Sequence, residues 1–355
     1  MLYNLQKQII WRECIAMKFT MNDIAKATGV SQPTISRILN GNTNVSTEKK
    51  IKVLDYIEKV GYRPNLVAKS LKNNNSYLIG LCVPDLLNPY FIELINSLEE
   101  ITKKNNYSLL IHSSNRNPII EWECISDFID RQVDGIAFIP CSNLNLTKLI
   151  ETNVPSVVLT QIKENIDSVG VNHFHGGLLA ARHLLNLGHQ RIGFIGGLAS
   201  EDEKFMGFQN ELNNNGIDFR MDDFLHISDY SSTARGFEKI IKHYFKEKAS
   251  DLPTAYFAGN DLIAFEIIKA LDDLNIKVPE DISVLGFDDT IIAKALKITS
   301  IKQPLEDMAK IGFELLLNKI KTKNEKTDKI DKIILDPFLF KRKSTKMNIE
   351  EPSGR

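Results

Sequence analysis

Hydrophobic and small residues recur at helical spacing in two short neighbouring stretches near the start of the chain. They form two faces: Ile24, Ala25 and Thr28 on the first stretch, and Ile35 and Ile38 on the second. Gly29 lies between the stretches and can adopt the positive φ that a tight turn requires. Residues 21–40 are therefore predicted to form two short helices joined by a tight turn.

A third amphipathic stretch, residues 47–60, comes next, and its expected buried face consists of Ile51, Val53, Leu54 and Ile57. Residues 65–71 can form one or two further helical turns, which are too short to be stable alone. Polar residues 72–76 then form a linker. The pattern predicts a small three-helix domain that is followed by a short helical hinge.

From Tyr77 onward the pattern changes to continuous apolar runs separated by amphipathic stretches. The runs expected to be strands are 78–83, 107–112, 135–140, 156–160, 168–171, 191–195, 226–228, 255–258 and 283–287. The expected helices are 90–105, 121–131, 177–187, 205–214, 234–244 and 261–274. Strands that are apolar throughout are buried on both faces, so this region is predicted to be an α/β fold with two doubly wound parallel sheets in two subdomains.

Charge divides the chain in the same way. The overall net charge is −1, but residues 17–75 contain ten Lys and Arg against four Asp and Glu, which is +6. Residues 1–16 carry +1, which leaves −8 for the remainder. A basic head on an acidic body is typical of a nucleic-acid-binding module joined to a domain that does not bind nucleic acid.

Other features of the sequence narrow the class of protein. No apolar run approaches the length of a membrane span, and the first residues lack the layout of a signal peptide, so a cytoplasmic protein is expected. The four cysteines, Cys14, Cys82, Cys124 and Cys141, show no metal-binding spacing and are expected to be reduced thiols. Because Met17 directly precedes the first helix, we expect translation to start there and residues 1–16 to lie outside the fold.

The second of the two short helices has the chemistry of a DNA reader. Its exposed positions are expected to be Gln32, Thr34, Ser36, Arg37 and Asn40. Amides, hydroxyls and guanidinium groups read base edges and bind phosphates. Ser31 is placed to cap this helix, and Pro33 suits its first turn. A helical hairpin whose polar face merely meets water is the alternative, but the basic neighbourhood favours a helix-turn-helix that binds DNA.

Several motifs extend this picture to the whole chain. The runs VSQPTISRILNG, NVST and GYRPNLVAKSL in the head resemble the lactose-repressor (LacI/GalR) family of bacterial transcription regulators. RQVDGIAFIP, HLLNLGHQRIGFIGG, VPEDISVLGFDD, TSIKQP and KRKST in the body resemble landmarks of the same family. The resemblance implies a hinge helix that folds on the operator, with Leu71 at the position of the family's leucine wedge in the minor groove. It also implies a body with the fold of a periplasmic sugar-binding protein.

Taken together, these features predict a specific division of the chain. The expected parts are an extension at 1–16, a helix-turn-helix domain at 17–64, a hinge helix and linker at 65–76, an effector-binding and dimerisation domain at 77–346 and a tail at 347–355. The N-subdomain is expected to comprise 77–174 and 304–330, and the C-subdomain 175–303 and 331–346. The expected DNA-contacting residues are Thr20, Ser31, Gln32, Pro33, Thr34, Ser36, Arg37, Asn40, Asn65, Ala68 and Leu71.

Polar and aromatic residues in loops at strand carboxyl ends predict an effector site between the subdomains. The candidates are Asp85, Tyr90, Phe91, Asn172, Lys204, Tyr230, Asn260 and Asp288. Aromatic faces stack on sugar rings, and carboxylates and amides bind vicinal hydroxyls, so a sugar-like effector is expected. Two positions depart from sugar-binding relatives: Lys204 replaces a usual arginine, and Asn172-His173 replaces a usual Asp-Asn pair.

Enzyme and metal chemistry find no support in the sequence. The histidines His173, His175, His183 and His189 match no established metal spacing, and Asp288 and Asp289 are adjacent and so point apart. No cofactor is expected. We predict a homodimeric transcription regulator that binds a pseudo-palindromic DNA operator, does not bind membranes and represses carbohydrate-utilisation genes until a small sugar-like effector releases it. The alternatives are a regulator that needs a purine or a partner protein as co-repressor, and, from another class, a cytoplasmic solute-binding protein.

Overall fold

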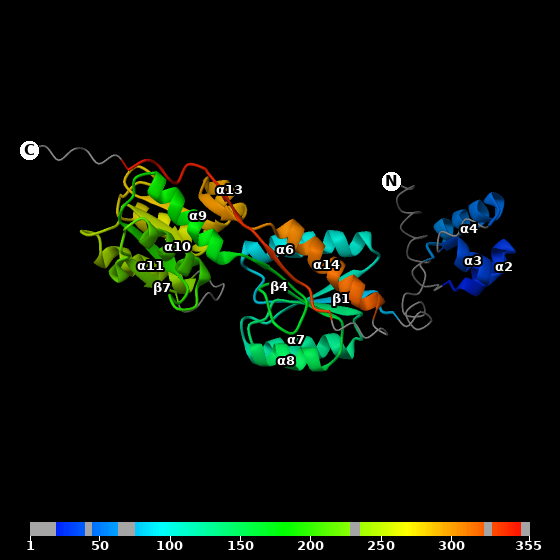
Figure 1. Ribbon diagram of the computed structural model, residues 1–355. Coiled ribbons are helices and arrows are strands. Elements are labelled where there is room, and N and C mark those ends of the chain that lie inside the picture. Colours follow the sequence, from blue (N-terminus) through cyan, green and yellow to red (C-terminus); the bar gives the residue numbers. More distant parts are fainter. Residues whose placement is uncertain (1–18, 40–44, 63–74, 228–234, 323–328, 349–355) are drawn as a thin grey trace, which may run out of the picture. The chain divides into compact units, whose positions relative to one another are not determined.

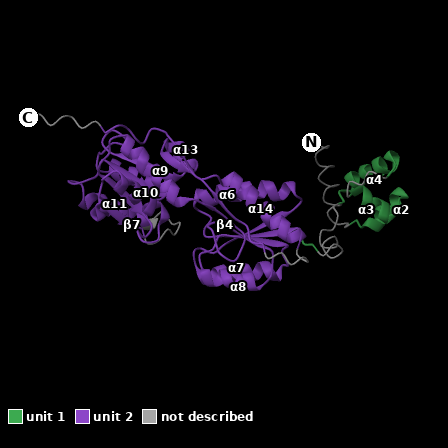
Figure 2. Cartoon of the chain, in the orientation of Figure 1, with its two compact units in different colours: residues 1–76 green, residues 77–355 purple. Residues whose placement is uncertain are grey.

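The computed structural model describes residues 19–39, 45–62, 75–227, 235–322 and 329–348 (Figure 1). It divides the chain into two compact units, residues 1–76 and 77–355, which are coloured separately in Figure 2. No helix among the described residues is both long and apolar enough to cross a lipid bilayer.

The described part of the small unit contains three helices, α2 (Met21–Thr28), α3 (Gln32–Leu39) and α4 (Thr47–Val60). Gly29 ends α2 in the left-handed conformation, with φ of 68°, and its N–H donates to the Ala25 carbonyl. The core beneath the turn consists of Ile24, Val30, Ile35, Ile38 and Val53, each at most 6% exposed. The predicted helix-turn-helix is therefore confirmed.

The expected buried face of the third helix is partly wrong. Val53 is buried, but Ile51 is 55% exposed and Leu54 is 41% exposed. At 100° per residue the face that contains Val53 continues through Tyr56 and Ile57, both of which pack against the core, whereas Ile51 and Leu54 lie on another side of the helix. The apolar residues of α4 thus form two faces, and only one of them meets the core.

The described part of the large unit contains two six-stranded sheets. The first has the order β11-β5-β4-β3-β1-β2, and all of its pairings are parallel. Its strands are β1 (Leu78–Val83), β2 (Ser108–Ser113), β3 (Gly135–Phe138), β4 (Ser156–Thr160), β5 (Ser168–Val171) and β11 (Lys332–Leu335). Its helices are α6 (Pro89–Lys104), α7 (Pro118–Asp130), α8 (Asn143–Glu151) and α14 (Leu305–Lys321). In Figure 1, α6 and α14 cover one face of this sheet and α7 and α8 the other.

The second sheet has the order β12-β10-β9-β8-β6-β7, and only the β10–β12 pairing is antiparallel. Its strands are β6 (Ile192–Gly196), β7 (Phe224–His226), β8 (Ala255–Ala258), β9 (Ser283–Asp288), β10 (Thr299–Lys302) and β12 (Phe338–Phe340). Its helices are α9 (His173–Asn186), α10 (Glu203–Asn214), η1 (Met221–Asp223), α11 (Arg235–Glu247), α12 (Asp261–Asp272) and α13 (Ile291–Leu296). Separate apolar clusters fill the two faces of each sheet, so both subdomains are doubly wound as predicted.

The chain passes between the subdomains at three places, two of which lie close to the predicted positions. It crosses between β5 and α9 and again between β10 and α14, close to the expected positions at Phe174 and Gln303. The third crossing, expected near Ile330, instead lies between Leu335 and Phe338, because β11 still pairs with β5 in the first sheet. The expected boundary at 330/331 is corrected accordingly: β11 belongs to the N-subdomain. The hydrophobic pattern of β11 could not show which sheet this strand joins, because it is a short edge strand with both charged and apolar residues.

Two glycines allow α9 and α10 to pack with their backbones in contact. A Cβ atom added at Gly177 would lie 2.0 Å from the Lys204 carbonyl oxygen, and one added at Gly207 would lie 1.9 Å from the Phe174 carbonyl oxygen. Each glycine thus faces the backbone of the other helix. The close approach matters for the site described below because it fixes Lys204 relative to the start of α9.

We expect Gly177→Ala to destabilise the protein. The added methyl group must displace backbone rather than a flexible side chain, and overpacking of this kind costs about 1–3 kcal/mol, which more than offsets the helical propensity that alanine gains. Urea unfolding should show a lower midpoint for the Gly177→Ala protein. Asn210→Ala, at an exposed position of α10, is the matched control and should leave the midpoint nearly unchanged. An unchanged midpoint for Gly177→Ala would contradict the close backbone contact.

Candidate functional site

The exposed face of α3 presents side chains that suit DNA contact. Gln32, Pro33 and Arg37 are exposed, whereas Ile35 and Ile38 on the opposite face are buried. The Gln32 amide Nε2 donates to the Asn22 side-chain oxygen at 3.2 Å, which links the start of α3 to α2. The face thus carries an amide and a guanidinium, and the apolar contacts beneath it hold the helix in place.

The hydroxyl residues beside α3 and α2 make local hydrogen bonds. Thr20 caps α2 in a reciprocal arrangement: its Oγ1 accepts from the Asp23 N–H, and the Asp23 carboxylate accepts from the Thr20 N–H. The Ser31 and Thr34 hydroxyl oxygens lie 2.9 Å apart. Ser36 is half-buried. Four expected DNA-contacting residues, Asn40, Asn65, Ala68 and Leu71, lie outside the described residues.

In the large unit, a chain of hydrogen bonds joins the two subdomains at one of the crossings. The Tyr90 hydroxyl, on α6, donates to the Gln303 side-chain oxygen at 3.2 Å. The Gln303 amide nitrogen in turn donates to the Asp288 carboxylate at 2.6 Å. All three side chains are at least 93% buried. Two of the predicted effector residues, Tyr90 and Asp288, are therefore connected through a residue that the sequence analysis did not single out.

Asp288 is in an unfavourable environment for a charged group. Burial raises the pKa of its carboxyl to about 6, although the Lys204 ammonium and the Gln303 amide both act to lower it. The backbone is also unusual here, because Asp288 has φ of 104° and Asp289 has φ of 58°. Such conformations are costly for residues other than glycine and concentrate at functional sites. The two neighbouring carboxylates have different partners: Asp288 accepts from Gln303, and Asp289 forms an ion pair with Arg342 at 2.5 Å.

A second buried carboxyl, Asp261, lies close to Asp288 but is well provided with donors. It accepts hydrogen bonds from the Thr290 N–H, the Thr290 hydroxyl and the Ser300 hydroxyl, at 2.7–2.9 Å. Burial, followed by the charge of Asp288, raises the pKa of Asp261 to about 8. A neutral Asp261 with three donors supports the turn after β9. Asp288 accepts a hydrogen bond from the Gln303 amide alone among the described side chains, so its carboxylate has acceptor capacity left for a ligand.

Lys204, at the start of α10, lies beside Asp288 without forming an ion pair with it among the described residues. Its ammonium donates to the Gly259 carbonyl at 2.8 Å and lies 4.3 Å from the centre of the Phe287 ring. His173 packs edge-on against the same ring, at 5.9 Å. Burial and the Lys204 charge lower the pKa of His173 to about 4, so its imidazole is neutral at neutral pH. We call Tyr90, His173, Lys204, Phe287, Asp288 and Gln303 the cleft cluster.

The remaining predicted effector residues take local structural roles. Asp85 accepts from the N–H groups of Leu87 and Asn88 and pairs with Arg116 at 3.3 Å. Asn172 caps α9 and Asn260 caps α12, in each case by accepting an N–H three residues later. Phe91 is buried against Tyr90, and Arg116 lies 6.0 Å from its ring centre. Tyr230 lies outside the described residues.

Glu93, on α6, makes a second connection between the subdomains. Its carboxylate accepts from the Ile291 N–H at 2.8 Å and pairs with Lys294, on α13, at 3.3 Å. Its charge also acts to raise the pKa of Asp288. A rearrangement of the two subdomains would have to break or re-form this contact together with the Tyr90–Gln303 bond.

The chemistry of the cleft cluster favours binding over catalysis. It contains a carboxylate, an amide, a phenol, a neutral imidazole and an aromatic face, which together can bind hydroxyl groups and the C–H face of a small ring. Among the described residues no three His, Cys, Asp or Glu side chains are grouped so that they could hold a metal ion. Sequence reasoning missed Gln303, Phe287 and Glu93. Gln303 lies in the TSIKQP motif and Phe287 in VPEDISVLGFDD, both of which were recognised only as landmarks, whereas nothing in the sequence distinguished Glu93 from an ordinary surface residue.

Comparison with known proteins agrees with this arrangement. Residues 20–65 match the bacterial regulatory proteins of the lacI family, and residues 181–345 match the periplasmic binding protein-like domain. The chain is 33% identical over 346 residues to the HTH-type transcriptional regulator DegA of Bacillus subtilis (strain 168), which covers 93% of this chain and 98% of the relative.

Two solved structures are also similar. One is the lac repressor dimer bound to operator and the anti-inducer ONPF, with a TM-score of 0.77 and 25% sequence identity. The match covers 93% of this chain and 100% of the repressor chain. The other is a LacI family transcriptional regulator from Enterococcus faecium with bound ribose, with a TM-score of 0.66 and 27% sequence identity. The match covers 77% of this chain and 100% of that regulator's chain. The chain therefore belongs to the lacI family of bacterial regulatory proteins, and it is a DNA-binding transcription regulator rather than an enzyme.

Proposed function

We propose that the protein is a homodimeric repressor of carbohydrate-utilisation genes, which releases its operator when a small sugar-like effector binds at the cleft cluster. The observation that carries this proposal is the buried Asp288 carboxylate, which among the described side chains accepts only from Gln303 and lies beside Lys204, Phe287 and the Tyr90–Gln303 bond. A sugar ring supplies hydroxyl donors for the carboxylate and a C–H face for the aromatic ring. The related regulator from Enterococcus faecium binds ribose, and the lac repressor binds operator as a dimer.

The proposed mechanism follows from the two-subdomain architecture. The α3 helices of the two subunits enter successive major grooves, with half-site centres roughly 34–36 Å apart or a multiple of that distance. Gln32 and Pro33 contact bases, Arg37 contacts a base or a phosphate, and Leu71 is the wedge at the centre of the operator. Effector binding changes the relative orientation of the subdomains, which moves the hinges and weakens operator binding. Because its target is chromosomal DNA, we place the protein in the cytoplasm.

The first test is the selection of random duplex DNA by the purified full-length protein without added ligand. Enrichment of a pseudo-palindrome would identify the operator and support a dimer that represses in the absence of effector. Failure to enrich a palindrome without ligand, followed by enrichment once a small molecule is added, would contradict the proposed release by effector.

Arg37→Ala should weaken binding to the selected operator. The guanidinium is exposed on α3 and is proposed to contact a base or a phosphate, and such a contact is worth about 1–3 kcal/mol. Fluorescence anisotropy at a fixed salt concentration should show an increase in Kd of on the order of tenfold or more. Lys59→Ala removes the same charge from the exposed last turn of α4 and serves as the control. Equal losses in both variants would show that α3 does not read the operator.

Asp288→Asn should abolish the response to effector while operator binding without ligand is retained. The substitution keeps the shape of the side chain but removes the carboxylate that accepts from the ligand hydroxyls. A panel of sugars is screened for protection against thermal unfolding, and each hit is then titrated into the operator complex. Asp272→Asn, an exposed position at the end of α12, is the control and should respond as the wild type does. A hit that acts equally on wild type and Asp288→Asn would place the effector elsewhere.

A further inference from the structure

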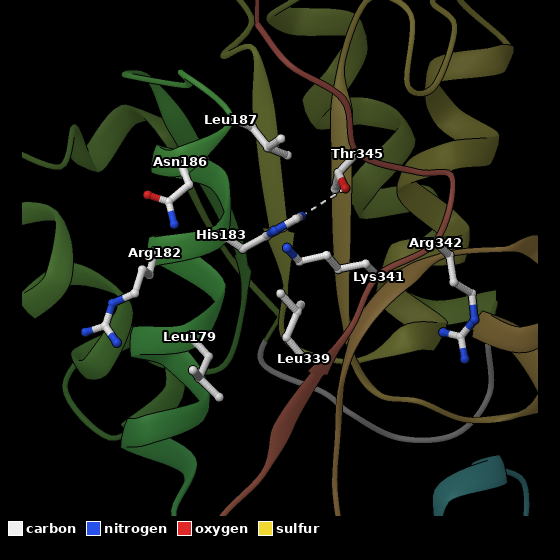
Figure 3. A pocket seen from close by; sticks show the side chains of 9 residues that line it. All are labelled: Leu179, Arg182, His183, Asn186, Leu187, Leu339, Lys341, Arg342 and Thr345. Atoms are coloured by element: carbon white, nitrogen blue, oxygen red, sulfur yellow. Dashed lines mark hydrogen bonds between the residues drawn. The ribbon is translucent and has the colours of Figure 1, made fainter.

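A pocket of about 400 Å³ lies in the C-subdomain (Figure 3). One wall is the second half of α9 and the residue that follows it, and the other is β12 with the segment that leads to Thr345. None of its lining residues belongs to the cleft cluster. Its volume falls in the range of ordinary small-molecule sites.

The two elements that form this pocket are strongly basic. Neither α9 nor residues 338–348 contain an Asp or Glu, whereas together they contain five Lys and Arg: Arg182, Lys341, Arg342, Lys343 and Lys346. Three of these, Arg182, Lys341 and Arg342, line the pocket, and no acidic residue among those that the structure describes does so. The lining therefore offers positive charge and hydrogen-bond donors to any molecule that enters.

Lys341 has the least compensated charge among the lining residues. Arg182 binds Glu211 through two hydrogen bonds of 2.9 and 3.1 Å, and Arg342 binds Asp289 and the Ile298 carbonyl. Within the described part of the chain, Lys341 forms no ion pair and no hydrogen bond. Figure 3 shows its side chain reaching into the pocket toward the His183 ring.

His183 shows how the Lys341 charge acts inside the pocket. Its Nε2 lies 3.0 Å from the Thr345 hydroxyl oxygen. Burial, and after it the Lys341 charge, lower the pKa of His183 to about 4, so that the imidazole is neutral at neutral pH. The charge of Lys341 thus reaches a buried, neutral imidazole, and an anion placed beside the ammonium would be stabilised by that charge.

We propose that this pocket binds a small organic oxyanion, a phosphate or a carboxylate carried on a short apolar skeleton. Lys341 binds the anionic group, with the Asn186 amide as a further hydrogen-bond donor. The leucine side chains of the lining, Leu179, Leu187 and Leu339, contact the skeleton. This second ligand site is independent of the sugar-like effector proposed for the cleft cluster.

The test is isothermal titration calorimetry of the full-length protein with three probes of similar size, in a phosphate-free buffer at constant ionic strength. Phenyl phosphate and benzoate carry the two candidate anions, and benzyl alcohol is their neutral counterpart. Binding of phenyl phosphate or benzoate, but not of benzyl alcohol, supports the proposal, and the stronger of the two anions identifies the group. Absence of binding by both anions at about 1 mM, or equal binding of benzyl alcohol, overturns it.

Two variants locate the binding. Lys341→Ala should weaken binding of the preferred anion at least tenfold, which corresponds to about 1.4 kcal/mol. Lys343→Ala is the matched control, because Lys343 is exposed on the same segment but does not line the pocket. Its affinity should stay within about twofold of the wild type, which is less than about 0.4 kcal/mol. Equal losses in the two variants would reveal non-specific attraction and overturn the proposal. Because both lysines are exposed, thermal unfolding should show that both variants are folded.

Discussion

The contacts between the two subdomains of the large unit depend on one buried carboxylate, that of Asp288, and on the hydrogen bonds available to it. Asp288 lies at the end of β9, is 7% exposed and receives a hydrogen bond from Gln303 at 2.6 Å. Burying a carboxylate with so few donors is costly, and the raised pKa of Asp288 is the measure of that cost. The strained backbone at Asp288 and Asp289 adds to it. A ligand rich in hydroxyl groups would relieve the carboxylate, which is why we propose that the effector binds there.

The same carboxylate also connects ligand binding to the relative position of the subdomains. Gln303 donates to Asp288 on one side and accepts from Tyr90, in the N-subdomain, on the other. A ligand that takes over the hydrogen bond to Asp288 therefore acts directly on the bond that spans the crossing. Glu93 and α13 form a second contact across the same junction. A regulated transition requires two alternative sets of contacts between the subdomains. The ligand shifts the equilibrium toward the set that it stabilises.

The sequence predicted the parts of this molecule whose pattern is local. The helix-turn-helix could be read because its apolar positions, Gly29 and the polar face of α3 all agree, and the parallel sheets because their strands are continuously apolar. Ile51 and Leu54 were misassigned because apolar residues of a short helix can fall on two faces. The role of Gln303 could not be predicted, since one partner, Tyr90, lies 213 residues away and the other, Asp288, lies on β9, 15 residues earlier. Asp85 and Asn260 were chosen for their chemistry, but their oxygens accept local N–H groups.

The most direct measurement is the number of protons exchanged when a sugar found by the stabilisation screen binds at about pH 6. Calorimetry in buffers of different ionisation enthalpy gives this number. Ligand hydroxyls that donate to Asp288 favour its charged form and lower its pKa below the ligand-free value of about 6. We therefore predict that the wild type releases protons when the sugar binds at this pH. Binding without proton release would show that the effector does not donate hydrogen bonds to Asp288.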